Sequence, residues 1–199
     1  MSEIISKEEL EKLIKIKGEM RGAGIKEVAA FVLKEEGKEG LKKLEDTMEK
    51  LGYPLKFKEI NIMQFYPLTL SAILEITVKR LFNYDDNKLQ EMGRFNAKLG
   101  LVITFLIKYL ISLDKATKEV QTMWKRYYTV GELTTTEYDK KKRYVILRLE
   151  NFAVHPVYCQ IFRGYFSAIL EIIVKSKVNC QETKCSFRGD QYHEFLLKW

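Results

Sequence analysis

The hydrophobic pattern of this chain changes its period near residue 130, and this change limits the folds open to it. Before that point, apolar residues recur at the helical spacings of three and four, as in Leu70, Ile73 and Leu74. After it, residues 131–138 and 143–150 are rich in β-branched and aromatic residues, and the second run alternates apolar and polar positions. Helices followed by strands in separate parts of one chain predict an α+β fold.

The order of the remaining elements follows from turn residues and further strand patterns. A turn at 139–142 joins the two runs into a hairpin, and Pro156 precedes another helical pattern. Strand patterns at 177–187 and 192–199 form a second hairpin, so we predict a twisted antiparallel sheet of two hairpins packed by helices. The predicted layout is a single domain over 1–199, with a helical portion over 5–128 and a β-hairpin, a helix and a β-hairpin over 130–199.

The distribution of charge argues against a nucleic-acid partner. The chain carries 34 basic and 27 acidic residues, a net charge of +7, but many of its N-terminal lysines are interleaved with glutamates. Such interleaving is typical of a solvated helix surface. The densest basic run, 140–143, falls in the predicted turn, and the aromatic and basic run at 124–128 belongs to no recognised nucleic-acid module. We therefore predict no nucleic-acid binding.

Cysteine usage and the length of the apolar runs predict a cytoplasmic protein. Three cysteines are sparse and odd in number, which argues against a secreted disulfide framework. The first residues are charged and lack the apolar core of a signal peptide. The longest apolar stretch, 99–113, is interrupted by Lys108 and is shorter than the roughly 20 residues that span a bilayer. We therefore expect a buried helix there and no transmembrane segment.

A nine-residue phrase almost repeats, as SAILEITVK at 71–79 and SAILEIIVK at 167–175. The first copy leads into a helix and the second into a strand, which argues against a duplicated domain. One interpretation is two core helices with similar packing needs. The other is that both helices line an apolar cavity, in which a few polar groups orient a ligand. The predicted pocket residues are Ser71, Leu74, Glu75, Val78, Ser167, Leu170, Glu171 and Val174.

The closing hairpin contains a possible metal pair, Cys185 and His193. A three-residue turn around Gly189 would place them opposite each other, whereas a two-residue turn would place them on opposite faces. Zinc prefers Cys and His ligands. Cys180 lies an odd five residues before Cys185, so it cannot share a metal with it without a bulge. Two alternatives remain, a zinc site and a buried cysteine beside a hydrogen-bonded histidine.

The other histidine pairings predict neither haem nor catalysis. His155 and His193 are the only imidazoles, and His155 precedes a predicted helix start, where helix capping or a surface position explains it. We therefore predict no haem and no other cofactor apart from the zinc alternative. Cys159 follows His155 by one helical turn, but Pro156 leaves His155 at the edge of that helix. No nucleophile with a base is evident, so the chain is predicted not to be an enzyme.

Four segments carry a resemblance to a known family. They are QFYPLTL at 64–70, WKRYYTVGEL at 124–133, FAVHPVYCQIFRGYFSAILE at 152–171 and CSFRGDQYHEFLLKW at 185–199. In order and spacing they resemble an uncharacterised bacterial family first noted in myxobacteria. That family is similar to the 4-vinyl-reductase-type small-molecule-binding domain, and more distantly to TRAPP vesicle-tethering core subunits and haem-based nitric oxide sensor domains. In many relatives a cysteine stands where this chain has His193.

The resemblance implies an α+β fold with a hydrophobic pocket, and a role in sensing, tethering or carrying. We therefore predict a non-enzymatic module that binds or senses a small hydrophobic molecule. One alternative is a protein–protein adaptor or tethering-type dimer with a filled core. A second is a structural zinc-binding domain. The expected partners are a small hydrophobic ligand and a second copy of the chain or a signalling protein.

Overall fold

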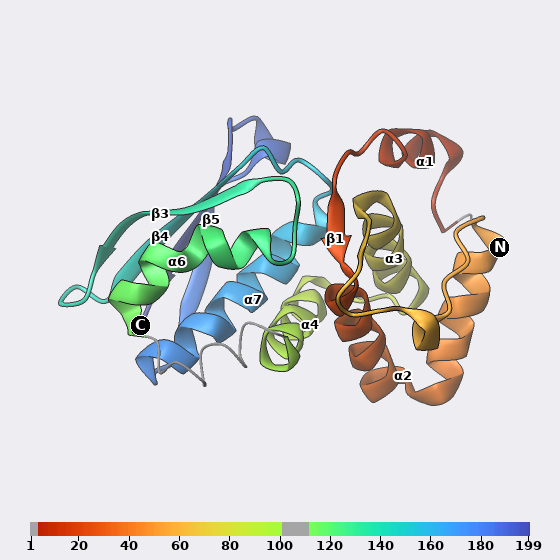
Figure 1. Ribbon diagram of the computed structural model, residues 1–199, viewed down its shortest axis with the longest axis horizontal. Helices are drawn as coiled ribbons and strands as arrows, with labels where there is room; N and C mark the ends of the chain where they lie inside the picture. The colour runs from red at the N-terminus through yellow and green to blue at the C-terminus, as the bar shows by residue number, and fades with distance from the viewer. Residues whose placement is uncertain (1–3, 101–111) are drawn as a thin grey trace.

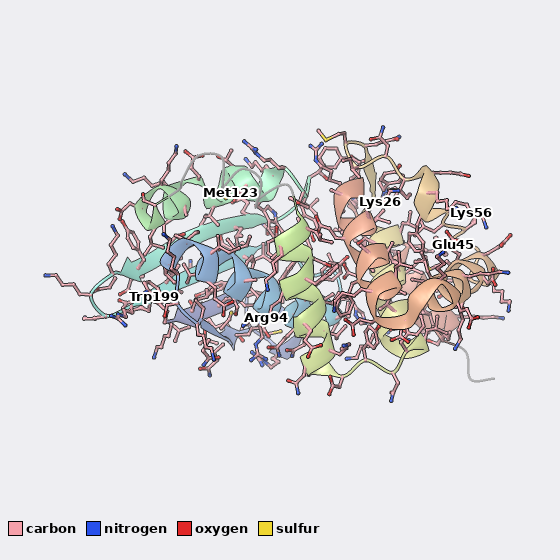
Figure 2. All side chains as sticks on the ribbon, turned by 90° about the horizontal axis from the view of Figure 1, so that it is seen from below. Lys26, Glu45, Lys56, Arg94, Met123 and Trp199 are labelled. Carbon is pink, nitrogen blue, oxygen red and sulfur yellow. The ribbon has the colours of Figure 1, made fainter. Side chains whose placement is uncertain are left out.

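The computed structural model describes residues 4–100 and 112–199 of the chain (Figure 1). The predicted α+β class is confirmed, because helices dominate the N-terminal part and an antiparallel sheet follows. The helices α1, α2 and α3 lie together at one end of the molecule, and the four-stranded sheet lies at the other with α6 and α7 (Figure 1). Seen from below, α4 runs between these two ends (Figure 2).

The N-terminal part consists of helices and two short strands. Its elements are α1 (Lys7–Leu13), β1 (Glu19–Arg21), α2 (Gly22–Lys50), η1 (Phe57–Glu59), β2 (Phe65–Pro67), α3 (Leu68–Leu81), α4 (Asp86–Leu99) and α6 (Leu113–Lys125). Most of the apolar stretch at 99–113 lies outside the described residues. The pair β1–β2 was not predicted, because a strand of three residues is too short to show alternation. It matters for the site, because the Arg21 amide donates to the Tyr127 carbonyl at 2.7 Å and ties this part to the end of α6.

The C-terminal part follows the predicted order of hairpin, helix and hairpin. Its elements are β3 (Glu132–Asp139), β4 (Tyr144–Glu150), α7 (Val157–Val174), β5 (Asn179–Lys184), η2 (Ser186–Arg188) and β6 (His193–Lys198). The sheet order is β3-β4-β6-β5, so the last strand pairs with β4 and joins the two hairpins. Along β4, Val145, Leu147 and Leu149 are buried and their neighbours are not, which confirms the predicted alternation.

Helices α4 and α7 cross at very short range, and two glycines permit this. A Cβ on Gly93 would lie 2.0 Å from the backbone oxygen of Ile161, and a Cβ on Gly164 would lie 2.0 Å from that of Gln90. Each glycine therefore faces the backbone of the other helix. The crossing fixes α7 against the helical end of the molecule, while its other side covers the sheet.

Helix α7 is also long and apolar enough to cross a membrane, the one such helix among the described residues. Of its 18 residues, 56% are buried inside the fold, as expected of a core helix. Its apolar residues therefore have a role in the fold itself.

Candidate functional site

An apolar cavity of about 130 Å³ lies between the sheet, α6 and α7. It extends to residues of β1, α2, α3 and α4. Representative lining residues are Val120 and Met123 of α6, Leu133 and Val145 of the sheet, and Phe166 and Ile169 of α7. Met123 projects from α6 in Figure 2. This volume approaches the roughly 150 Å³ of an engineered apolar cavity that binds benzene. The two helices and the sheet thus enclose space for a small apolar molecule.

Two carboxyl side chains and one carboxamide reach this cavity from three different helices. Glu27 of α2, Glu75 of α3 and Asn96 of α4 line it, and they are only 7%, 2% and 6% exposed. Glu27 Oε1 accepts a hydrogen bond from Tyr127 Oη at 3.1 Å. Glu75 Oε2 and Asn96 Oδ1 have no hydrogen-bond partner among the described residues. Unpaired buried acceptors are rare in folded proteins, so they mark this end of the cavity.

Burial controls the protonation of both carboxyls. It raises the pKa of Glu27 to about 8, although the hydrogen bond from Tyr127 opposes the shift. It raises the pKa of Glu75 well above its ordinary value, against the opposing hydrogen bond of Tyr158. Among the described residues that line the cavity, none is a lysine, arginine or histidine. Burial therefore favours the neutral form of both carboxyls.

Replacement of Glu27 by glutamine should flatten the pH dependence of stability. The folded protein holds the Glu27 proton up to about pH 8, whereas the unfolded chain releases it near pH 4.5. Between these two pH values, the proton held by Glu27 makes the free energy of unfolding fall by about 1.4 kcal/mol for each unit by which the pH rises. Urea unfolding at several pH values between pH 5 and pH 8 measures the free energy of unfolding. This free energy should fall less steeply with pH for Glu27→Gln than for the native chain. Equal slopes would contradict the raised pKa of Glu27.

The repeated phrase contributes Glu75 from the first copy, and Ile169, Leu170 and Ile173 from the second, to the lining of the cavity. Of the predicted pocket residues, Glu75 and Leu170 line it. In the first copy, Ser71 lies behind Glu75, where its hydroxyl accepts from Tyr158 Oη at 3.1 Å. The remaining first-copy residues, Leu74 and Val78, are fully buried in the core and are not among the lining residues.

The polar residues of the second copy form hydrogen bonds and an ion pair with other parts of the protein. Glu171 pairs with Arg94 of α4, with 2.8 Å between Oε2 and Nη1, and it accepts from the Val178 amide at 3.0 Å. Arg94 lies where α4 passes α7 (Figure 2). Ser167 donates to the Arg163 carbonyl of its own helix at 2.8 Å, and Val174 is the last residue of α7. Ser167, Glu171 and Val174 do not line the cavity.

A second cluster lies under the other end of α7, where Cys159, Glu182, Cys185 and His193 meet. Their ligand atoms all lie within 4.8 Å of one another. Cys159 Sγ lies 3.7 Å from Cys185 Sγ and 4.0 Å from His193 Nδ1, and this nitrogen lies 3.0 Å from Glu182 Oε1. The side chains of His193 and Glu182 are 5% and 7% exposed.

These distances resemble those of a tetrahedral zinc site. Two sulfur atoms that each lie about 2.3 Å from a tetrahedral zinc ion are about 3.8 Å apart. The Cys159–Cys185 separation of 3.7 Å matches this value, and sulfur, nitrogen and carboxylate oxygen are all zinc ligands. The four side chains could therefore hold zinc with little movement.

The cluster contains the predicted pair and two residues that the sequence did not assign to it. Cys185 and His193 meet, but the connection between them is longer than either predicted turn and contains η2. It is closed by Asp190, whose Oδ2 accepts from the Cys185 amide at 2.8 Å. Cys180 lies outside the cluster, although a register shift does follow Glu182 on β5. Glu182 lies two residues after Cys180 and so on the same face of the strand, a signal that could have identified it.

Cys159 is not an activated nucleophile. Burial, then the neighbouring Glu182 and Cys185, raise the pKa of its thiol well above the ordinary range. A thiol without a metal is therefore neutral here, and a neutral thiol is a poor nucleophile. His155 does not approach it as a base, because its Nδ1 accepts from the Val157 amide at 3.1 Å and its Nε2 lies 3.4 Å from Glu9.

The fold is similar to that of H-NOX proteins. No family model matches the sequence, and no curated protein matches it. A crystal structure of an H-NOX protein from S. oneidensis in the Fe(II)NO ligation state is 13% identical, covers 90% of this chain and 98% of its own, and has a TM-score of 0.68. A structure described as "Modulating Heme Redox Potential Through Protein-Induced Porphyrin Distortion" has a TM-score of 0.59, with 13% identity over 90% of this chain and 100% of its own.

A trafficking protein particle complex subunit 3 from Naegleria fowleri, covalently bound to palmitic acid, has a TM-score of 0.49. It is 18% identical and covers 65% of this chain and 92% of its own. The distant relation predicted to haem-based sensor domains is confirmed for the fold. The myxobacterial family and the 4-vinyl-reductase-type relation remain predictions.

The prediction that the chain takes no haem is contradicted by these structures. Proteins with this fold were solved with Fe(II) ligation states and in work on haem distortion, so the fold accommodates haem. The sequence prediction relied on the two histidines alone, whereas haem iron also accepts tyrosine, cysteine and methionine ligands. An argument from two histidines therefore could not exclude haem. At these identities the comparison establishes that the chain has the H-NOX fold.

Proposed function

We propose that this chain is the small-molecule-binding module of a sensing system, and that the cavity between the sheet, α6 and α7 receives the ligand. The observation that carries the proposal is the cavity itself, with apolar walls and the unpaired acceptors of Glu75 and Asn96. Ligand sites commonly combine an apolar lining with a few polar groups that orient the guest. Both oxygens belong to residues that line the cavity, and unpaired buried acceptors are rare in folded proteins.

Haem is a candidate ligand of this cavity because of the fold. The described walls offer Tyr and Met side chains to a haem iron, among them Met20, Met123 and Tyr165. Neither of the two histidines lines the cavity. At about 130 Å³ the cavity is also smaller than the roughly 300 Å³ at which drug-sized sites begin. Haem binding would therefore need a wider cavity and an iron ligand other than histidine.

The ligand state of the purified protein tests this proposal. Native mass spectrometry and the visible absorption spectrum of gently purified protein should reveal a bound molecule. If the protein carries none, it should take up added toluene. A Soret band would identify haem as the ligand. In Val120→Phe the larger side chain enters the cavity, and we expect about tenfold weaker toluene binding. The control is Ile14→Phe at a side chain that is 54% exposed, and it should bind as the native chain does.

Equal toluene binding in both variants, or no bound molecule and no uptake, would contradict the cavity as the ligand site. The same mass spectrum reads the oligomeric state. A bare dimer would favour the alternative of an adaptor with a filled core.

Structural zinc binding is a second candidate function, which the cluster of Cys159, Glu182, Cys185 and His193 favours. Its donors join α7 to β5, the η2 connection and β6, so a metal would fasten the helix to the sheet edge. This role is compatible with a ligand in the cavity, because no cluster residue lines the cavity.

A further inference from the structure

The polar end of the cavity contains two side-chain oxygens that lack a hydrogen-bond partner among the described residues. Glu75 Oε2 and Asn96 Oδ1 are both unpaired among the described residues, and both side chains are more than nine-tenths buried. Glu27 supplies a second carboxyl from α2, already bonded to Tyr127. These groups come from three different helices, α2, α3 and α4.

We propose that the cavity selects a small apolar amine, whose nitrogen donates to Glu75 and Asn96 while its apolar body packs against α6 and α7. The inference rests on the proposed function and adds the chemical class of the ligand. An ammonium group carries three donors and no acceptor, so it complements two acceptors directly. A fatty acid or another carboxylate would instead bring an ionised group to a site whose described lining offers no cation to pair with it.

The described groups around these carboxyls supply no competing cation. Tyr158 of α7 and Tyr128 face Glu75. Tyr127 faces Glu27, and Tyr165 lies close to both of these residues. No described lining residue is basic. An ammonium ligand would therefore be the counterion of a carboxyl that otherwise stays protonated. Its entry ionises Glu75, and the carboxyl proton leaves to the solvent, so that one proton is released for each ammonium ion bound.

The apolar part of the cavity sets the size of the ligand. Its volume of about 130 Å³ is close to that of a cavity that binds benzene, which limits the apolar body of the ligand to about one six-membered ring. Trp124, Phe162 and Phe166 present aromatic surfaces along the walls. Such surfaces also attract a cation that lies near a ring face.

Four molecules of nearly equal size separate the possibilities: toluene, benzyl alcohol, benzoate and benzylamine. We expect benzylamine to bind about tenfold more tightly than toluene or benzyl alcohol, and benzoate to bind least. Calorimetry in buffers of different ionisation enthalpy should register release of about one proton with benzylamine and none with toluene. In Glu75→Gln the preference for benzylamine should disappear while toluene binding persists. Persistent toluene binding also verifies that the cavity is intact.

Two further variants serve as a control and as a second test of the polar end of the cavity. Glu171→Gln removes a carboxyl from the equivalent position of the second copy, which pairs with Arg94 outside the cavity, so benzylamine binding should not change. Asn96→Leu removes the other acceptor and should weaken benzylamine binding even if Glu75→Gln fails to fold. Equal affinity for toluene and benzylamine would overturn the amine inference and leave the proposed function standing. Failure of all four molecules to bind would overturn both.

Discussion

Alanine in place of Gly164 is expected to lower the free energy of unfolding by about 3 kcal/mol, the upper part of the range for overpacked cores. The added Cβ would lie 2.0 Å from the Gln90 backbone oxygen, and a helix backbone cannot rotate away as a side chain can. Helices α4 and α7 would have to separate, which would disturb the packing on both sides of α7. Urea unfolding followed by circular dichroism measures the loss.

The matched control is Gly52→Ala. Gly52 has φ +82°, and a Cβ there would meet nothing within 4 Å, so only backbone strain of about 1 kcal/mol is expected. Gly93→Ala should behave like Gly164→Ala, because its Cβ would approach the Ile161 oxygen to the same distance. If Gly164→Ala costs no more than Gly52→Ala, the short-range crossing of α4 and α7 is wrong.

The fold could be predicted where local periodicity determines it. The period change near residue 130 predicted the α+β class, and the alternation in β4 predicted which of its side chains are buried. The β1–β2 pair could not be predicted, because its hydrogen bonds join residues more than 40 positions apart and each strand has three residues. The crossing at Gly93 and Gly164 was also hidden, since a glycine in a helix does not reveal which backbone will approach it.

The site could be predicted only in part, for the same physical reason. The two copies of the repeated phrase lie on α3 and α7, which both contribute to the core, but the surroundings decide the role of each residue. Glu75 meets a cavity with one oxygen unpaired, whereas the equivalent Glu171 meets Arg94. In the cluster, Cys185 and His193 are close in sequence, and Cys159 joins them only through the packing of α7 on the sheet. Tertiary contacts of this kind leave no periodic signal in the sequence.

Each chain is expected to bind one zinc ion. The bound zinc should stabilise the fold by about 4 kcal/mol when the free zinc concentration is about 1,000-fold above the dissociation constant. The reason is that the donors come from α7 and from the sheet edge, and only the folded chain brings them within 4.8 Å. Elemental analysis of protein purified under reducing conditions measures the stoichiometry. Thermal unfolding with added zinc, and then with a chelator, measures the stabilisation.

The three cysteines provide a matched pair of variants for this test. Cys159 and Cys180 are both buried, at 7% and 4% exposed, but only Cys159 belongs to the cluster. Alanine at either position removes one buried thiol and leaves a similar small void. Cys159→Ala should therefore lose stoichiometric zinc and the zinc-dependent rise in stability, whereas Cys180→Ala should keep both. Retention of zinc by Cys159→Ala, or equal loss in both variants, would show that the four side chains of the cluster do not form the metal site.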